Sequence, residues 1–182
     1  MAQDLLNNCS FDGDKLKTLW IGSRLVDGSP ITYPLEYQTV SGTSDSVIAV
    51  TNWDFDNSIV TIGGQQVLVN EITNTGDNIS FEETYVVNAN GKVYQKKISF
   101  IIPNIQIFLV NQLKEFTISS AGQFALSPTI CFIVDENDNY LVVGYDKALY
   151  LQNTDFIIGD ENQVTLSYQS TSQSRARAYE II

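Results

Sequence analysis

Short apolar runs, some of them alternating with polar residues, recur along much of this chain, and this pattern predicts β-strands. Residues 15–22 form the first run, and residues 47–50, 59–62 and 67–69 follow it after two loops rich in glycine and serine. Gly63 and Gly64 separate the last two runs. A glycine pair predicts a two-residue hairpin turn, because glycine reaches the positive φ of such turns at no steric cost.

A longer hairpin is predicted in the middle of the chain, from residues 79–87 and 92–102, with residues 88–91 (Asn-Ala-Asn-Gly) as its loop. Its register pairs Phe81 with Ile98, Glu82 with Lys97, Glu83 with Lys96, and Tyr85 with Tyr94. Opposite-charge and aromatic pairs contribute about 0.2–1 kcal/mol each, so we favour this register over that of a two-residue Asn-Gly turn. The ribbon is only half apolar, and we expect it to project from the domain and to need a neighbour.

Residues 103–122 depart from the strand pattern. Apolar side chains recur there at helical spacing, and Asn104 precedes them as a candidate N-cap. The apolar positions are Ile105, Phe108, Leu109, Leu113 and Phe116. We predict one amphipathic helix, although the β-branched Ile107 and Val110 lower the helix propensity of the segment.

The last part of the chain returns to strands. Residues 130–134 and 140–145 predict a second hairpin, and residues 162–170 predict a final strand with Val164, Leu166 and Tyr168 on one face. At 182 residues the chain suits a single domain, residues 1–182, with an N-terminal arm (1–14) and a C-terminal tail (171–182). The predicted fold class is mainly β: a β-sandwich or barrel with a long central hairpin and one amphipathic helix.

The composition of the chain argues against some classes of binding partner. The chain has 21 acidic residues against 10 lysines and arginines, a net charge of −11, which argues against sequence-independent binding of nucleic acid. No basic segment followed by an apolar stretch opens the sequence, and the longest apolar run is too polar for a bilayer, so we expect neither a signal peptide nor a membrane partner. Cys9 and Cys131 are expected to be free thiols in a reducing compartment.

Two acidic clusters are candidates for cation binding. They are Asp54, Asp56 and Asn57 in one loop, and Asp135, Glu136, Asp138 and Asn139 at the tip of the second hairpin. The first lacks the central glycine and the closing glutamate of a calcium loop. The second has no further acidic ligands that the sequence pairs with it, and such residues favour turns because their side chains bond nearby backbone groups. We interpret both clusters as loop and turn residues.

Catalytic signatures are missing from the sequence. The chain has no histidine, the commonest general base, and no phosphate-binding loop, nucleophile elbow or zinc pattern. Glu82 and Glu83 are adjacent on a predicted strand and therefore point to opposite faces, so they cannot share one catalytic site. We expect no enzymatic activity, no cofactor and no metal.

The order of elements supports a family resemblance. The segment "FIVDENDNYLVVGYDKALYL", followed by "VTLSYQS", resembles the C-terminal part of bacteriophage tail tube (major tail) proteins, notably those of phages of Bacteroides-type hosts. The matching residues are Asp135–Asn139, Gly144–Asp146 and Thr165–Tyr168. The resemblance rests on pattern rather than on an invariant motif and does not extend to the first 60 residues.

This resemblance implies a virion structural protein that assembles into rings, commonly hexameric, in the phage tail. Central hairpins of neighbouring subunits would join into one barrel around a channel through which duplex DNA passes without specific binding. The partners would be further copies of the chain and other tail or connector proteins, and the protein would be made in the cytoplasm of the bacterial host.

Two sets of residues follow from this reading. The expected subunit-interface residues are Phe81, Glu83, Tyr85, Tyr94, Lys96 and Ile98. The expected channel-lining (lumen) residues are Asp77, Glu82 and Glu83, since acidic side chains let phosphates slide past.

Two alternatives stay open. One is a tail terminator or completion ring, which would share the same assembly. The other is a glycan-binding receptor-recognition (adhesin) β-domain, in which Trp20, Trp53 and some of the nine tyrosines would present aromatic rings to sugars.

Overall fold

The computed structural model describes residues 16–35, 47–74, 76, 78–88, 91–103, 128–157 and 163–181. Eleven strands and no helix occur in this part of the chain, so the predicted mainly β class is confirmed. The strands are β1 (Leu16–Leu25), β2 (Ile48–Asp54), β3 (Ile59–Ile62), β4 (Gln65–Thr73), β5 (Ile79–Asn88), β6 (Gly91–Pro103), β7 (Ile130–Asp135), β8 (Tyr140–Val143), β9 (Tyr150–Ile157), β10 (Gln163–Ser172) and β11 (Arg177–Ile181).

Some predicted segments fall outside the described residues. The amphipathic helix predicted for residues 103–122 does so except for Pro103, which ends β6 as a strand residue. The expected N-terminal arm (1–14), with Cys9, also lies outside them. Two strands, β9 and β11, were not predicted, and β11 comes from the C-terminal segment to which the sequence pattern assigned no element.

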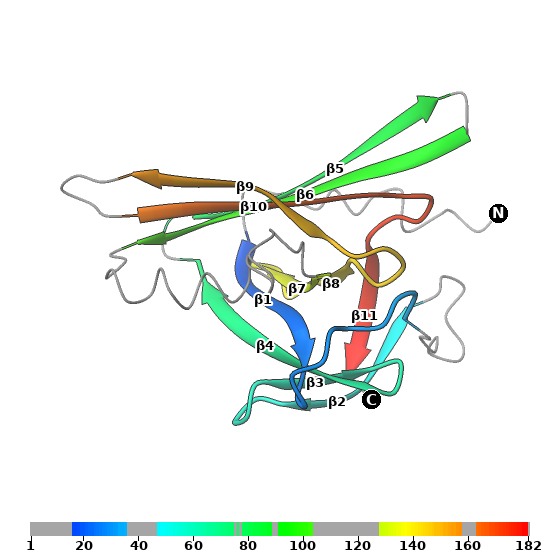
Figure 1. The fold of residues 1–182 in the computed structure, drawn as a ribbon, viewed down its shortest axis with the longest axis vertical. Coiled ribbons are helices and arrows are strands. Elements are labelled where there is room, and N and C mark those ends of the chain that lie inside the picture. Colours follow the sequence, from blue (N-terminus) through cyan, green and yellow to red (C-terminus); the bar gives the residue numbers. More distant parts are fainter. Residues whose placement is uncertain are drawn as a thin grey trace.

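Seven strands close into a barrel, in the order β1-β4-β3-β2-β11-β8-β7 (Figure 1). β11 closes it, pairing in parallel with β2 and antiparallel with β8. Inward-facing side chains of the barrel strands, among them Trp53, Phe132 and Tyr179, form one buried core together with Tyr145 from the segment after β8. The predicted Gly63–Gly64 turn joins β3 to β4, with Ile62 opposite Gln65 and φ values of 56° and 72° at the two glycines.

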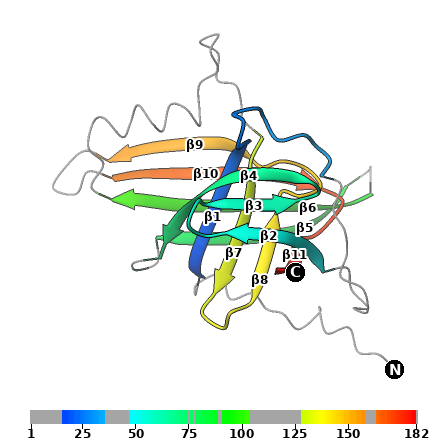
Figure 2. The ribbon, with the colours of Figure 1, turned by 90° about the horizontal axis from the view of Figure 1, so that it is seen from below.

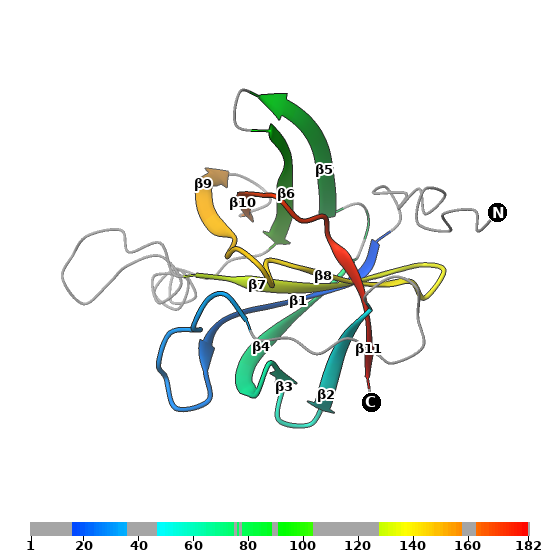
Figure 3. The same cartoon turned by 90° about the vertical axis from the view of Figure 1, so that its right-hand side faces the viewer.

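The other four strands form a second, antiparallel sheet in the order β5-β6-β10-β9. Its inner face covers the outside of β1, β7 and β8, and Figure 2 shows those strands crossing the second sheet steeply. This interface is the second buried core, with Phe100, Leu166 and Tyr168 from the sheet and Leu19 and Ile133 from the barrel. The molecule therefore has two layers, a barrel and a sheet (Figure 3).

β7 serves both cores. Ile130 and Phe132 belong to the barrel core, whereas Cys131 and Ile133 belong to the core between barrel and sheet. All six residues of the strand are buried, which explains why its sequence is continuously apolar up to Asp135 rather than alternating.

The central hairpin has the predicted register. Phe81 lies opposite Ile98, Glu82 opposite Lys97, Glu83 opposite Lys96, and Tyr85 opposite Tyr94. The pairing extends one step beyond the prediction, to Asn88 and Gly91. The hairpin is not a lone ribbon, because β6 also pairs with β10 from Pro103 to Tyr94. Only its tip continues past the end of β10, and it projects beyond the body of the molecule (Figure 1).

Candidate assembly surface

The outer face of the second sheet carries mostly hydroxyl and amide side chains. Alternate residues of its four strands lie on this face, opposite to those that enter the core. They include Ser80, Glu82 and Thr84 on β5, Gln95, Lys97 and Ser99 on β6, Ser167, Gln169 and Thr171 on β10, and Asn153 and Asp155 on β9. We call this set of residues the polar face.

Rows of similar side chains cross the polar face. Ser80, Ser99 and Ser167 lie opposite one another on three adjacent strands, and the hydroxyls of Ser99 and Ser167 are 2.8 Å apart. A polar cavity of about 200 Å³ lies on the next rows, lined by Glu82, Thr84, Gln95, Lys97, Gln169 and Thr171, with contributions from Lys96 and Ser170. Hydroxyl and amide groups predominate on this face, which by strand alternation also carries Val86, Val93 and Ile101. Such a surface is suited to contact with water or with a hydrated polymer.

The structure separates the expected lumen residues. Glu82 lies exposed on the polar face, opposite Lys97. Glu83 lies on the inner face, where its carboxylate accepts hydrogen bonds from Arg175 Nε at 3.1 Å and from the backbone N–H of Ala176 at 2.6 Å. Asp77 is outside the described residues. Of the two expected lumen residues that the structure describes, Glu82 lies on the polar face.

The six expected interface residues share the inner face of the hairpin, where they divide into two groups. Ile98 and Lys96 are 0% and 1% exposed within the subunit, and Phe81 packs against the second core. Tyr85 and Tyr94 lie nearer the tip, with ring centroids 5.3 Å apart and Tyr85 46% exposed. The base of this face is therefore used inside the subunit, and the tip is accessible to a neighbour.

A buried charged cluster lies under the hairpin. Lys96 Nζ lies 3.5 Å from Asp146 Oδ1 and donates a hydrogen bond to Ser172 Oγ at 2.9 Å. It also lies 5.7 Å from the centroid of the Tyr145 ring. Burial lowers the pKa of the Lys96 ammonium, while the nearby carboxylates of Asp146 and Glu83 act in the opposite direction. The sequence predicted the pairing of Lys96 with Glu83 but not its burial or its contact with Asp146.

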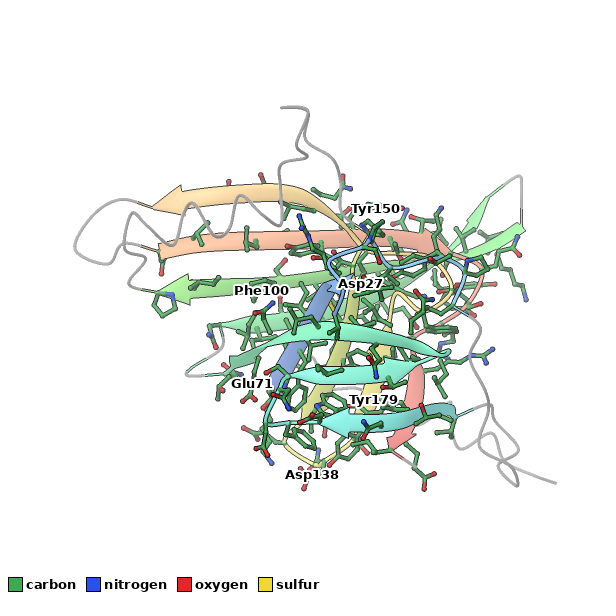
Figure 4. All side chains as sticks on the ribbon, turned by 60° about the horizontal axis from the view of Figure 1, so that its bottom comes forward. Asp27, Glu71, Phe100, Asp138, Tyr150 and Tyr179 are labelled. Carbon is green, nitrogen blue, oxygen red and sulfur yellow. The ribbon has the colours of Figure 1, made fainter. Side chains whose placement is uncertain are left out.

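The acids of the second hairpin belong to its turn, as predicted. Asp135 Oδ1 accepts hydrogen bonds from the backbone N–H groups of Asn137 and Asn139, and Oδ2 accepts one from the side-chain amide of Asn139. Asp138, at the tip of the hairpin (Figure 4), has a φ of 57° and pairs with Lys17 Nζ at 3.1 Å. Because the Asp135 carboxylate is already bonded to the turn, this cluster has a structural explanation.

In the loop after β2 an aspartate likewise accepts hydrogen bonds from a nearby asparagine. Asp54 accepts hydrogen bonds from the side-chain amide and the backbone N–H of Asn57, and these bonds lower the pKa of the Asp54 carboxyl. In the described part of the chain no group of three or more cysteine, aspartate or glutamate side chains is arranged to hold a metal ion. The same residues contain no helix that is long and apolar enough to cross a membrane.

The two tryptophans are packing residues. Trp53 is buried in the barrel core and meets Trp20 edge-on, with ring centroids 5.0 Å apart. Trp20 is half-buried, and its Nε1 donates a hydrogen bond to Glu71 Oε2 at 3.2 Å. Phe55, stacked on Trp53 and 61% exposed, is the accessible ring of this group. The arrangement gives little support to a sugar platform built on the tryptophans.

Comparison with known protein families, with curated proteins and with solved structures gives no match to this chain. The resemblance to phage tail tube proteins therefore rests on the sequence features of residues 132–151 and 164–170 alone.

Proposed function

We propose that this protein is a virion structural protein whose copies assemble into a ring, in a phage tail tube or another tail ring, around a conduit for DNA. The ring is a homo-oligomer, with six copies as the expected number. No catalysis is assigned to it. The observation that carries the proposal is the polar face, which is bounded on both sides by strand edges to which the described residues give no partner.

The strand directions of the second sheet favour continuation from copy to copy. Each of its neighbouring pairs is antiparallel, so the edge strands β5 and β9 run in opposite directions. The β9 edge of one copy can therefore pair antiparallel with the β5 edge of the next. Such pairing removes exposed edges, which natural proteins avoid leaving open, and a closed ring of copies has none left.

The side chains of the polar face fit the lining of a DNA channel. Hydroxyl and amide groups predominate, and its charged members are Glu82, Asp155 and Lys97. Closely spaced cations would bind phosphates and release counterions, which would hold DNA in place. A face without such a cluster lets a polyanion pass.

The hydrogen-bond pattern of the hairpin indicates where a neighbour would bind. The backbone N–H of Ile101 donates to the carbonyl of Asn78, so residues 78 and 101 form a hydrogen-bonded pair. Because such pairs alternate along an antiparallel ladder, the N–H of Val87 points away from β6, toward the open edge. The Val87 side chain is 67% exposed.

The test uses this N–H. Val87→Pro removes an outward-facing donor without removing a bond to β6, and proline is tolerated on an edge strand. Val87→Thr is the matched control, since it keeps the N–H and the β-branched shape. We expect electron microscopy and mass measurement to show rings for the wild type and for Val87→Thr, and folded monomers for Val87→Pro. A wild type that stays monomeric at high concentration overturns the proposal, and rings of Val87→Pro overturn pairing through the β5 edge.

A further inference from the structure

The Lys96 side chain is enclosed in a way that is unusual for a lysine. Its exposed fraction is 0%, although lysine is almost never fully buried. Lys96 belongs to β6 of the second sheet, and its side chain lies on the face of that sheet that covers the barrel. Its amine meets Asp146 and Ser172, and the ring of Tyr145 covers one side.

A second carboxylate belongs to the same enclosure. Glu83 lies directly opposite Lys96 on the same face of the hairpin, and its side chain is 13% exposed. Side chains directly opposite each other on antiparallel strands have their Cβ atoms about 4.5–5.5 Å apart. An amine and two carboxylates thus lie on the covered side of the sheet, with side-chain exposures of 0% for Lys96, 19% for Asp146 and 13% for Glu83.

Such an enclosure favours reaction between the amine and the carboxylate. Desolvation disfavours the charged form of Lys96 and increases the share of neutral amine, the nucleophilic form of lysine. Nζ is 3.5 Å from Asp146 Oδ1, so the amine and the carboxyl group are neighbours, and a rotation about the Cα–Cβ bond of Asp146 can move its carboxyl carbon toward the amine. The Asp146 side chain is 19% exposed, which gives a released water molecule a route to solvent.

We propose that Lys96 and Asp146 join through an intramolecular isopeptide bond. Lys96 Nζ forms a bond to Asp146 Cγ, and the bond from Cγ to one carboxylate oxygen breaks. Two of the three ammonium protons leave with that oxygen as water, and the third stays on the new amide nitrogen. Ammonium and carboxylate thus become amide and water, with no change in oxidation state and no cofactor.

We assign to Glu83, which lies opposite Lys96 on the inner face of the hairpin, the transfer of a proton from the amine to the leaving oxygen. Its carboxylate acts electrostatically on Lys96 and is kept in position by Arg175 and Ala176. Ser172 Oγ orients the amine by accepting a hydrogen bond from it. The product has no ionic groups left at the reacting atoms, so the reaction removes the free-energy cost of keeping two charges under the sheet.

The bond would connect the two layers. Lys96 belongs to the central hairpin, whereas Asp146 follows β8 of the barrel. A covalent link between them would prevent the hairpin from separating from the barrel when force acts on its tip.

Intact-protein mass spectrometry of the wild type tests the proposal directly, whatever the variants do. The expected mass is that of the chain minus one water molecule, and a protease digest should yield one branched peptide joining Lys96 to Asp146. The full chain mass after prolonged incubation overturns the proposal. Loss of water without the branched peptide, for example through a succinimide at Asp27-Gly28, overturns it equally.

Variants add sharper readouts. Lys96→Arg and Asp146→Ala should both show the full chain mass, while Lys97→Arg, the next residue but on the polar face, should still lose water. Asp146→Asn should lose ammonia instead of water, because the amide nitrogen is then the leaving group. Glu83→Gln should slow the appearance of the branched peptide at least tenfold relative to Glu82→Gln, and equal rates for these two variants overturn the role of Glu83.

Discussion

Glu83 and Lys96 lie opposite each other in the central hairpin, yet each is bonded to a different part of the molecule. The carboxylate of Glu83 accepts hydrogen bonds from Arg175 and Ala176, just before β11, while the amine of Lys96 reaches Asp146, just after β8. One cross-strand pair thus fixes the hairpin to two separate segments that flank barrel strands.

The first prediction concerns the Glu83 side of this arrangement. Glu83→Gln should reduce the free energy of unfolding by about 1–3 kcal/mol, because it weakens charge-assisted bonds to Arg175 and to a partly buried backbone N–H. Glu82→Gln, on the polar face, should change it by less than about 0.5 kcal/mol. Urea unfolding of the two variants measures the difference, and equal losses would mean that the Arg175 and Ala176 contacts do not stabilise the fold.

The second prediction concerns Gly144, which belongs to the segment that resembles tail tube proteins. Its φ is 90°, and an added Cβ would lie 2.8 Å from the carbonyl oxygen of Thr129. Gly28 has a similar φ of 85° with nothing within 4 Å of an added Cβ. Gly28→Ala should therefore lower the free energy of unfolding by about 1–2 kcal/mol through backbone strain alone. Gly144→Ala should lower it by about 1–3 kcal/mol more, because the added Cβ also clashes with Thr129.

Thermal and urea unfolding of both glycine variants check this prediction. Equal losses would show that the contact between Gly144 and Thr129 relaxes without cost.

The third prediction concerns alkaline pH. Burial raises the pKa of the Tyr179 phenol above its ordinary 10.0, and Tyr140 adds to the rise. Above about pH 10 the unfolded chain releases the phenolic proton before the folded protein does. The contribution of Tyr179 to the free energy of unfolding should therefore be fully present below about pH 10 and fall as the pH rises further. The Tyr179 hydroxyl has no hydrogen-bond partner among the described residues.

Tyr179→Phe removes this titrating group. We expect a free energy of unfolding at pH 7 that is unchanged or about 1 kcal/mol higher, and a smaller loss between pH 9 and pH 11 than in the wild type. Tyr85→Phe, at an exposed position on the hairpin tip, is the control. The same alkaline loss in Tyr179→Phe and in the wild type would contradict the assignment to Tyr179.

The fourth prediction tests the polar face as a channel lining. In assembled rings, Thr84→Lys with Gln169→Lys should produce salt-sensitive retention of duplex DNA that wild-type rings lack. The control places the same two charges on the exposed barrel residues Asn52 and Gln66. Equal retention by both pairs in fluorescence anisotropy would mean that added charge, and not its position, causes the binding.

Local pattern was sufficient to predict the strands whose partners lie nearby in the chain. The register of the central hairpin follows from its own charge and aromatic pairs, and the β3–β4 turn follows from Gly63 and Gly64. β11 was not predictable in this way, because it is short and its partners, β2 and β8, are distant in sequence. β9 was missed because polar residues such as Asn153 and Asp155 interrupt its apolar pattern.

The site was predictable only in part, for a related reason. Strand alternation divides the hairpin into two faces but does not tell which face will be covered. Each face carries one glutamate and one lysine opposite each other, Glu82 with Lys97 and Glu83 with Lys96, so charge does not distinguish them. Which pair is buried depends on the barrel strands beneath and on residues 145–146 and 172–176, which no local pattern connects to the hairpin.

The position of β11 also bears on how the chain is made. Of the seven barrel strands, the one that fits between β2 and β8 is the last to be synthesised. On the ribosome the other six strands are complete while a gap remains in the wall, with two unpaired edges and with the place of Tyr179 in the barrel core still empty. The nascent barrel thus has an interval of exposure to aggregation, and that interval ends only when Arg177–Ile181 emerge and insert.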